Sequence, residues 1–455
     1  MALRKATGLI ARPGAGKTRM ILGALDDQNS TDSPIIINCS GPAVATWEKE
    51  IPKWLGSGHH IHIVSGLKPA ERAKLWDHAR TGEANNWFVT NYSIFLRDFD
   101  LIYGIGHKKA QHWGANVNDE YHKAFRRRKS QTFAKIKRLT QFMETHISAS
   151  GSSMGRDPST LFTLLQMCDR RAFSSYWQFV NTFCLVIDGY AGKQIVGAKP
   201  SAIPQFKAII DKYLAYIPDA VTADEQPEGV RRAFDVKMTP KQANIYNQLA
   251  SEMYAVIDGD ETNVIMTGSK MDLAIKLRKL LCCPRILDPS LEMGGGYDAI
   301  VDTLDVQPHI IICVPFRDAC DVVAAQLKID LKTEDVFIIK GQIGNDELKK
   351  RLSAFRHTKG IIVTTIAAAE SWDAETCETT FFLGYDQNTG QLQQAEGRTQ
   401  RAISTHPYIQ WKYVKYAQTI DEATLLDIDK TLTHIASVMS RTDRFINALK
   451  GVPNE

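Results

Sequence analysis

The stretch Ala11-Arg12-Pro13-Gly14-Ala15-Gly16-Lys17-Thr18 decides the fold of the first part of this chain. The apolar run at residues 8–10 is typical of a strand that enters a sheet, and the apolar residues at 20–22 have the spacing of a helix. A glycine-rich turn between a strand and a helix directs backbone N–H groups at phosphate oxygens. The alternative is a glycine-rich turn that merely precedes a lysine, and the flanking strand and helix patterns favour the phosphate-binding loop.

Each residue type in this loop has a physical role in holding a nucleotide. Gly14 and Gly16 carry no Cβ, so the backbone can approach phosphate closely. Lys17 would place its charge on the β- and γ-phosphates, and the Thr18 hydroxyl would hold Mg²⁺. Position 11 is Ala where the strict pattern has Gly. We predict that ATP and Mg²⁺ bind here, through Pro13, Gly14, Ala15, Gly16, Lys17 and Thr18.

The bulk composition narrows the class of protein. A chain of 455 residues is too long for one core and predicts two or three domains. No apolar run approaches the length of a membrane span, and the eight cysteines lack metal-type spacing. We expect a soluble intracellular protein with reduced, mostly buried thiols. The net charge of +4 neither requires nor excludes a nucleic-acid partner.

Strands and helices alternate in two separate series. This alternation predicts an α/β fold with parallel sheets. The expected strands of the first series follow the loop at residues 34–39, 60–64 and 87–90. Those of the second series lie at residues 309–314, 337–339 and 361–365. Between the two series the regular alternation is lost, and we expect helices at residues 241–257 and 271–281.

Two adjacent carboxylates, Asp119 and Glu120, follow a run at residues 113–118 that could form a strand. An ATPase needs one carboxylate to orient Mg²⁺ and another to position the attacking water. Asp–Glu pairs are also common on solvated surfaces, and residues 113–118 are more polar than a central strand usually is. From the residues alone, both interpretations stay open.

Basic residues gather directly after this pair. They are Lys123, Arg126, Arg127, Arg128, Lys129, Lys135, Lys137 and Arg138. An exposed charged helix face would have this composition, and so would a rim that contacts nucleic-acid phosphates beside the ATP site.

The order of the motifs resembles that of the superfamily 2 helicases. Within them, the chain is similar to the Swi/Snf-type DNA-dependent ATPases, especially the small forms carried by bacteriophages. Segments that resemble their motifs I, Ia, Ib, II, III, V and VI lie at residues 11–18, 38–47, 90–93, 119–122, 148–153, 364–373 and 394–401. Residues 175–184 resemble a tract behind motif III. Tyr121 replaces the Ala of the family's Asp-Glu-Ala-His motif, and Ala369 and Ser371 stand where motif V usually has glycines.

The resemblance implies two RecA-like lobes with ATP in the cleft between them. In lobe 1, Lys17 would contact phosphate, Asp119 would hold the metal together with Thr18, and Glu120 would position or activate water. The ten residues before the loop leave no room for the upstream segment whose glutamine reads adenine in this family. We therefore expect adenine to be held loosely or by another part of the chain.

A second lobe must bring cations to the γ-phosphate that the first lobe holds. Arg398 and Arg401 are three residues apart, a spacing that would place both on one helix face. By resemblance to motif VI, Arg401 would be the arginine finger and Arg398 a phosphate or interlobe contact. Gln394 and Gly397 of the same segment would adjoin the nucleotide. The alternative is a surface helix with a face rich in Gln and Arg.

These observations combine into one expected architecture and one expected function. We expect lobe 1 at residues 1–190, a mainly helical bridge at 191–295, and lobe 2 with C-terminal helices at 296–455. The expected function is ATP-driven translocation on duplex or forked DNA in recombination, replication or repair, in the cytoplasm of a bacterial host. Phage or host proteins of these processes would be partners, and a membrane would not. A degenerate, weakly hydrolysing clamp for DNA or protein is the alternative. A small-molecule P-loop kinase would explain neither the second lobe nor motif VI.

Overall fold

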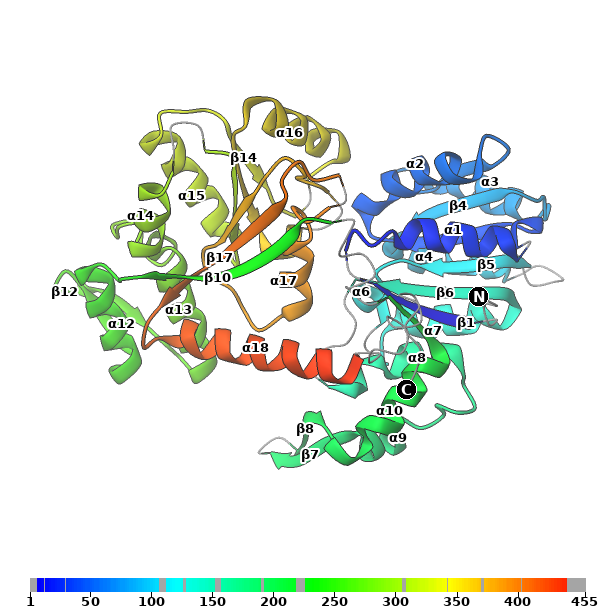
Figure 1. Cartoon of the computed structure of the whole chain (residues 1–455), viewed down its shortest axis with the longest axis horizontal. Coiled ribbons are helices and arrows are strands. Elements are labelled where there is room, and N and C mark those ends of the chain that lie inside the picture. Colours follow the sequence, from blue (N-terminus) through cyan, green and yellow to red (C-terminus); the bar gives the residue numbers. More distant parts are fainter. Residues whose placement is uncertain are drawn as a thin grey trace. The chain divides into compact units, whose positions relative to one another are not determined.

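The computed structural model describes residues 6–11, 13–28, 30–105, 112–125, 128–151, 157–189, 192–217, 226–304, 308–341, 343–369, 372–401 and 403–439. The chain divides into two compact units. Unit 1 comprises Met1–Thr222 with Thr433–Glu455, and unit 2 comprises Ala223–Leu432. Each unit is built on one parallel sheet with helices packed on it (Figure 1). The predicted α/β class with two parallel sheets is confirmed.

The sheet of unit 1 has seven strands in the order β3-β4-β2-β5-β6-β1-β9, and all neighbouring strands run parallel. The strands are β1 (Ala6–Ala11), β2 (Ile35–Cys39), β3 (His60–Ile63), β4 (Asn86–Asn91), β5 (Trp113–Asn118), β6 (Met143–Ser150) and β9 (Leu214–Ile217). Every residue of β2 is buried, because helices cover both faces of the sheet. Ile35 and Ile37 face the core that contains Trp47, and Ile36 faces the opposite core that contains Trp76.

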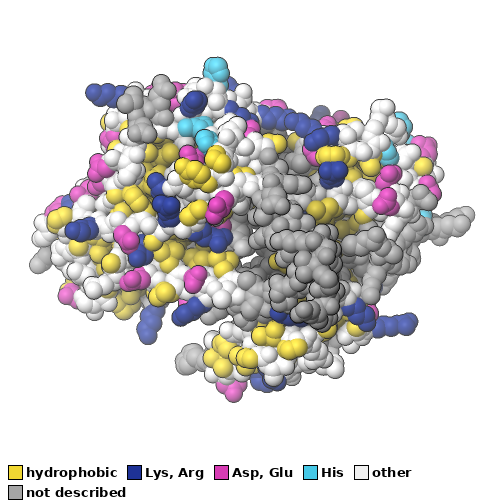
Figure 2. All heavy atoms as spheres, in the orientation of Figure 1, with side chains coloured by type: hydrophobic (Ala, Val, Ile, Leu, Met, Phe, Trp, Pro, Cys, Tyr) yellow, Lys and Arg dark blue, Asp and Glu magenta, His cyan; other side chains and the backbone are white. Residues whose placement is uncertain are grey.

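The helices of unit 1 supply those two cores. They are α1 (Lys17–Asp27), α2 (Val44–Leu55), α3 (Pro69–Ala79), α4 (Tyr92–Arg97), α5 (Phe99–Tyr103), α6 (Tyr121–Phe125), α7 (Gln131–Leu139), α8 (Phe162–Cys168), α9 (Tyr176–Phe183) and α10 (Ile203–Tyr213). An antiparallel hairpin of β7 (Cys184–Gly189) and β8 (Gly192–Ala198) follows α9. Its apolar residues Leu185, Ile187 and Val196 are exposed, and Figure 2 shows hydrophobic side chains at the surface there.

The sheet of unit 2 has six strands in the order β10-β17-β16-β13-β15-β14, again all parallel. They are β10 (Glu228–Val236), β13 (Ile310–Val314), β14 (Val336–Ile339), β15 (Ile361–Thr365), β16 (Thr379–Phe382) and β17 (Tyr408–Tyr416). The helices are α12 (Pro240–Glu252), α13 (Lys270–Cys282), α14 (Gly295–Asp302), α15 (Arg317–Asp330), α16 (Asn345–Thr358), α17 (Thr389–Glu396) and the first part of α18 (Ile420–Met439), whose residues from Thr433 on belong to unit 1. A small hairpin of β11 (Tyr254–Ile257) and β12 (Asp260–Met266) lies between α12 and α13 in the sequence.

The polar run at residues 113–118 forms β5, a fully buried strand inside the sheet. The asparagines of this strand form hydrogen bonds with one another and with β2, although Asn38 Oδ1 and Asn116 Nδ2 are buried without a partner among the described residues. Asn118 accepts a hydrogen bond from Asn38 of β2 at 3.1 Å and donates one to Asn116 at 2.5 Å. A polar sequence is therefore compatible with a central strand here, because the neighbouring strand supplies a matching amide.

The helical bridge expected at residues 191–295 is not a separate unit in the part of this range that the structure describes, residues 192–217 and 226–295. Within this range, β9 pairs with β1 in the sheet of unit 1, and β10 pairs with β17 in the sheet of unit 2. The helix expected at 241–257 is also too long. It ends before Met253, which adopts φ 64°, and the chain then enters the β11–β12 hairpin. The helix expected at 271–281 is confirmed as α13.

Two further expectations concern the chain as a whole. All eight cysteines are free, and all but the partly exposed Cys168 are buried, as predicted. Among the described residues, no helix is long and apolar enough to cross a membrane.

Candidate nucleotide-binding site

The predicted phosphate-binding loop connects β1 to α1. Gly14 and Gly16 adopt φ values of 81° and 76°, the left-handed region that glycine enters at little cost. A Cβ built on Gly16 would meet no atom within 4 Å, so the space beside the loop is open. Ala15 is buried and Pro13 is partly exposed. The loop therefore has the backbone conformation and the open side that a phosphate needs. Arg12 lies outside the described residues.

Lys17 is the first residue of α1, and its side chain points back across the loop. Its Nζ donates a hydrogen bond to the carbonyl oxygen of Ala11 at 3.1 Å. The same nitrogen lies 3.9 Å from Oε1 of Glu120. The Lys17 and Glu120 side chains are only 12% and 18% exposed, so this ion pair is shielded from water. The structure thus brings together the lysine and the glutamate that the sequence placed about a hundred residues apart.

Asp119 follows the last residue of β5 and is held by three neighbouring elements. Its backbone N–H donates to the carbonyl of Asn38 at 2.8 Å, and its own carbonyl accepts from the Tyr92 hydroxyl at 2.8 Å. Its carboxylate Oδ2 accepts from the indole Nε1 of Trp47 at 3.1 Å. Burial raises the pKa of the Asp119 carboxyl above its usual value, and the negative charge of Glu120 raises it further. A nearby cation would therefore be strongly attracted to this carboxylate.

Glu120 has a positive φ of 50° and turns its side chain toward the end of β6. Its Oε2 accepts the backbone N–H of Gly151 at 3.1 Å and lies 3.3 Å from Nδ1 of His122. That nitrogen is also 2.8 Å from the Ser150 hydroxyl. Burial is the largest effect and would raise the pKa of Glu120, but the charges of Lys17, His122 and Lys123 and the Gly151 hydrogen bond together lower it, and the net shift is downward.

Gly151 contacts the acidic pair and the phosphate-binding loop. It was identified from the sequence only as a member of the small-residue motif at 148–153. A Cβ built on Gly151 would lie 3.3 Å from Glu120 Oε1, 3.3 Å from Pro13 Cγ and 3.4 Å from Lys17 Nζ. The end of β6 therefore closes tightly on both the loop and the carboxylate. The sequence could not predict this close approach, because it depends on β6 lying between β5 and β1 in the sheet. Ser152 and Ser153 of the same motif lie outside the described residues.

Unit 2 contains the segment predicted to supply cations, and its local structure corrects one expectation. The helix α17 ends at Glu396, so Arg398 and Arg401 do not share a helix face. After Glu396 the backbone tightens into turns, with Arg398 N–H bonded to the Ala395 carbonyl at 3.1 Å and Thr399 N–H bonded to the Glu396 carbonyl at 3.3 Å. Gly397 adopts an ordinary right-handed conformation at the helix end.

The two arginines have different environments in unit 2. Arg398 is buried, and its guanidinium donates to the carbonyls of Gln394 at 2.9 Å and Trp372 at 2.7 Å. Arg401 is paired through Nη2 with Oδ1 of Asp373 at 2.6 Å. Arg398 therefore stabilises the loop at Trp372 through backbone hydrogen bonds, whereas Arg401 is held by the Asp373 carboxylate. Gln394 is buried beneath them.

Glu396 was not identified from the sequence, and its carboxylate connects the end of α17 to strands β10 and β17. Its buried carboxylate accepts two hydrogen bonds from Arg231 of β10, at 2.5 and 2.7 Å, and one from the Tyr413 hydroxyl at 2.9 Å. A signal was present, because Glu396 lies four residues after the buried Leu392 and so on the inward face of α17.

Comparison with known proteins agrees with this geometry. The SNF2-related domain matches residues 4–286, and the helicase conserved C-terminal domain matches residues 297–403. Because the first match covers more than half of the chain, the protein belongs to the SNF2 family, the Swi/Snf-type branch of the superfamily 2 helicases. The family expected from the motif order is confirmed.

Solved structures with a similar fold include two from one archaeon. The Sulfolobus solfataricus SWI2/SNF2 ATPase core in complex with dsDNA is 19% identical, over 98% of this chain and 90% of that chain, with a TM-score of 0.42. The core domain from the same organism is 17% identical, over 99% of this chain and 90% of that chain, with a TM-score of 0.39. No curated protein sequence matches this chain.

Proposed function

We propose that this protein is a DNA-dependent ATPase that uses ATP and Mg²⁺ to translocate along duplex or forked DNA. The observation that carries the proposal is the convergence of Lys17, Glu120 and Gly151 at the open side of the phosphate-binding loop. These residues belong to three motifs that are far apart in sequence. Membership of the SNF2 family supports the same assignment.

The loop and the acidic pair fit a nucleotide with a divalent cation. The N–H groups at the start of α1 and the Lys17 ammonium would bind phosphate oxygens. Thr18 and Asp119 would hold Mg²⁺, which prefers one or two protein oxygens together with phosphate oxygens. The raised pKa of Asp119 fits this role, because a bound cation offsets the cost of keeping that carboxylate charged. The cation would neutralise charge that develops on the phosphates.

Glu120 fits the role of the residue that orients and deprotonates the attacking water. Its lowered pKa keeps it ionised at neutral pH, so its carboxylate can accept a hydrogen bond from the attacking water. Gly151 and His122 fix the direction of its carboxylate. Arg401 would complete the site by stabilising charge in the transition state, after exchanging Asp373 for a phosphate oxygen. Gln394, Gly397 and Arg398 would support that segment.

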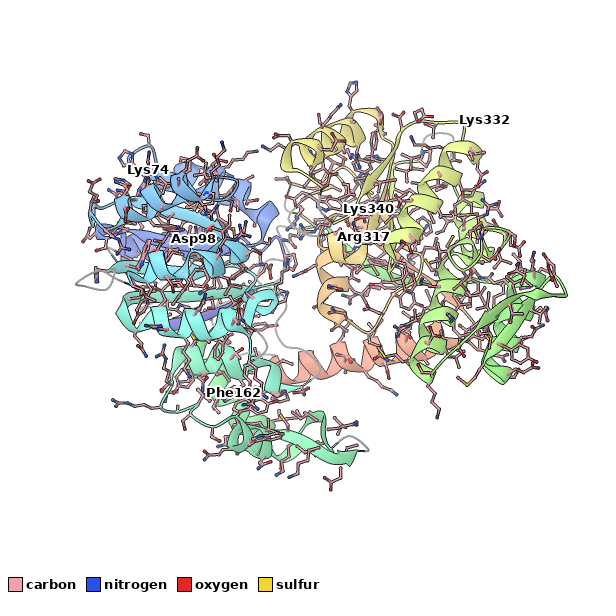
Figure 3. The ribbon with its side chains drawn as sticks, turned by 180° about the vertical axis from the view of Figure 1, so that it is seen from behind. Lys74, Asp98, Phe162, Arg317, Lys332 and Lys340 are labelled. Carbon is pink, nitrogen blue, oxygen red and sulfur yellow. The ribbon has the colours of Figure 1, made fainter. Side chains whose placement is uncertain are left out.

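Unit 2 offers cations where a DNA backbone could bind. Arg317 is exposed at the start of α15, directly after β13, and Lys340 follows the end of β14 (Figure 3). Arg317 Nη2 donates to the Gly341 carbonyl at 3.4 Å, which keeps the two cations close together. Ligands of parallel α/β sheets bind outside the carboxyl ends of the strands. Lys340 is paired with the Asp321 carboxylate at 2.5 Å, so Arg317 is the cation that supports DNA phosphate binding by unit 2.

The test is steady-state ATP hydrolysis by the full chain at fixed low salt, without nucleic acid and with single strands, blunt duplex or forks. The variant Glu120→Gln removes the base but keeps the size of the side chain, and Glu48→Gln on α2 serves as a matched control. We expect DNA to stimulate hydrolysis, Glu120→Gln to lower kcat roughly 10²- to 10⁴-fold, and Glu48→Gln to leave it unchanged.

Translocation requires a second measurement, because hydrolysis does not by itself show movement. Displacement of a short third strand from a triplex by the wild-type protein would support it. Hydrolysis near background, with ATP and DNA both bound, would reject the motor and favour the weakly hydrolysing clamp. A role in recombination, replication or repair with phage or host proteins stays a prediction.

A further inference from the structure

The first turn of α9 presents a large aromatic ring to solvent. Trp177 is 48% exposed, whereas Phe179, Val180 and Phe183 of the same helix are buried. The buried residues recur at helical spacing and fix which face of α9 packs on unit 1. Trp177 lies outside that face. It is therefore exposed because of the way α9 packs, and not because the end of the helix is frayed.

A neighbouring aromatic cluster supports the exposed indole. Tyr176 lies edge-on to Trp177, with ring centroids 5.4 Å apart, and also packs edge-on against the buried Phe162 at 5.2 Å. Phe162 lies at the start of α8 (Figure 3). The Ser175 hydroxyl caps α9 by accepting the Gln178 N–H at 3.3 Å. The Trp177 ring is thus carried by a capped helix that is anchored in the core.

One cation lies over the Tyr176 ring of this aromatic pair, and two more are close in sequence to that cation or to the pair. The Arg128 guanidinium lies 4.6 Å from the centroid of the Tyr176 ring. Lys129 follows it in sequence, Arg171 lies in the turn before α9, and all three cations are exposed. The nearby Asp169 is engaged by the Arg171 and Ala172 backbone N–H groups and by the Tyr213 hydroxyl. An exposed indole, next to a tyrosine ring that carries an arginine, matches the composition of sites that stack a base and contact its phosphates.

We propose that Trp177 is a stacking site for an unpaired DNA base, with Arg128 as its phosphate contact. This inference rests on the proposed function and specifies the DNA structure that the protein prefers. Bases inside a duplex are covered by their neighbours on both faces, so away from the helix ends an indole can stack only on a base that is unpaired. The site therefore selects forks or single strands over blunt duplex, whereas Arg128 contacts the backbone of any DNA.

The experiment measures the Kd of the full chain for a labelled fork and for a blunt duplex of equal length, without nucleotide and at fixed salt. The variants are Trp177→Ala and Trp177→Phe. Trp54→Ala is the matched control, since Trp54 of α2 is 39% exposed but its indole N–H donates to the Glu50 carboxylate at 2.5 Å, which places a negative charge where a phosphate would have to lie. Thermal unfolding of each variant reports whether the fold is retained.

We expect Trp177→Ala to bind the fork roughly 5- to 150-fold more weakly and the duplex as the wild type does. Trp177→Phe retains a ring and should bind the fork within about threefold of the wild type, because any aromatic face can stack. Trp54→Ala should change neither Kd. Arg128→Ala should weaken binding to both DNAs and reduce the slope of log Kd against log salt by about 1.

If Trp177→Ala binds the fork as tightly as the wild type, Trp177 is not a stacking site for DNA. A contact of Trp177 with a protein would not change that conclusion. The stacking site is equally overturned if fork and duplex binding fall together. ATP hydrolysis by the wild-type protein tests the proposed function separately. Stimulation by DNA together with unchanged fork binding by Trp177→Ala would remove the stacking site and leave the ATPase in place. Absence of stimulation by any DNA would instead reject the ATPase.

Discussion

Gly151 donates its backbone N–H to the carboxylate of Glu120 at 3.1 Å, and this bond joins the end of β6 to the acidic pair after β5. Because the same carboxylate lies 3.9 Å from Lys17, a shift of the backbone at Gly151 changes the position of the base relative to the phosphate-binding loop. The β6 end is therefore in direct contact with the groups that we propose carry out hydrolysis.

Gly151→Ala should lower kcat about tenfold with a smaller effect on nucleotide affinity. The added methyl group would lie within 3.4 Å of Glu120, Pro13 and Lys17, so the carboxylate or the loop must move by a few tenths of an ångström. Small displacements of a catalytic group have large effects on rate. The control is Gly58→Ala, where a Cβ would meet no atom within 4 Å. Equal ATPase rates for wild type and Gly151→Ala would contradict the prediction.

Arg401→Ala and Arg401→Lys should both lower DNA-stimulated kcat, by roughly 10³-fold for the alanine variant. Lysine cannot replace the planar guanidinium that binds phosphate through two donors. Single-turnover hydrolysis measures the chemical step, and nucleotide binding should be nearly unchanged. Arg232→Ala, an exposed arginine of β10, is the control. If Arg401→Lys retains the wild-type rate, Arg401 is not the finger.

Asp98→Ala should destabilise unit 1 by about 3–5 kcal/mol. Asp98 accepts hydrogen bonds from Arg72 Nε at 2.6 Å, Arg72 Nη2 at 3.0 Å and Trp76 Nε1 at 3.0 Å, and both charged side chains are 5% exposed (Figure 3). Without Asp98 the arginine would remain charged and buried with no carboxylate among the described residues to pair with, and would keep only the hydrogen bond of its Nη1 to the Leu67 carbonyl at 2.8 Å.

Urea unfolding followed by tryptophan fluorescence measures this loss. Lys74→Ala, on the exposed side of the same helix α3, should change stability by less than about 0.5 kcal/mol. A double variant with Arg72→Met and Asp98→Ala should recover part of the loss, because no unpaired charge then remains. A loss in Asp98→Ala no larger than in Lys74→Ala would count against the buried ion pair.

Asp421 should make the stability of unit 2 depend on pH. Burial raises the pKa of this carboxyl from 3.8 to about 7, although the charge of Arg278 opposes the rise. The folded state therefore keeps a proton that the unfolded state releases near pH 4. The resulting stability is fully present below that pH and is lost as pH rises through about 7.

The measurement compares wild type with Asp421→Asn, whose amide does not titrate. The free energy of unfolding of the wild type should fall by about 2–3 kcal/mol relative to the variant between pH 5 and pH 8. Parallel pH profiles for the two proteins would show that Asp421 ionises normally in the folded state.

The local patterns of the sequence were sufficient for much of the fold. Gly14, Gly16 and Lys17 between a strand and a helix predicted the phosphate-binding loop, because loop conformation and helix start are encoded by adjacent residues. Asp119 and Glu120 do follow a strand, which is one of the two interpretations that the residues left open. The polar composition of β5 gave no reason to expect a buried strand, since its amide partner, Asn38, lies far away in the sequence.

By itself, the sequence determined the two series of strands and helices, the loop and the membership of the motifs in one family. Only the tertiary structure decided that β9 and β10 join different sheets, that α17 ends before Arg398, and that Gly151 and Trp47 hold the acidic pair. The physical reason is the range of the interactions. Hydrophobic period and turn chemistry act between residues a few positions apart, whereas these contacts depend on which strands become neighbours in the sheet.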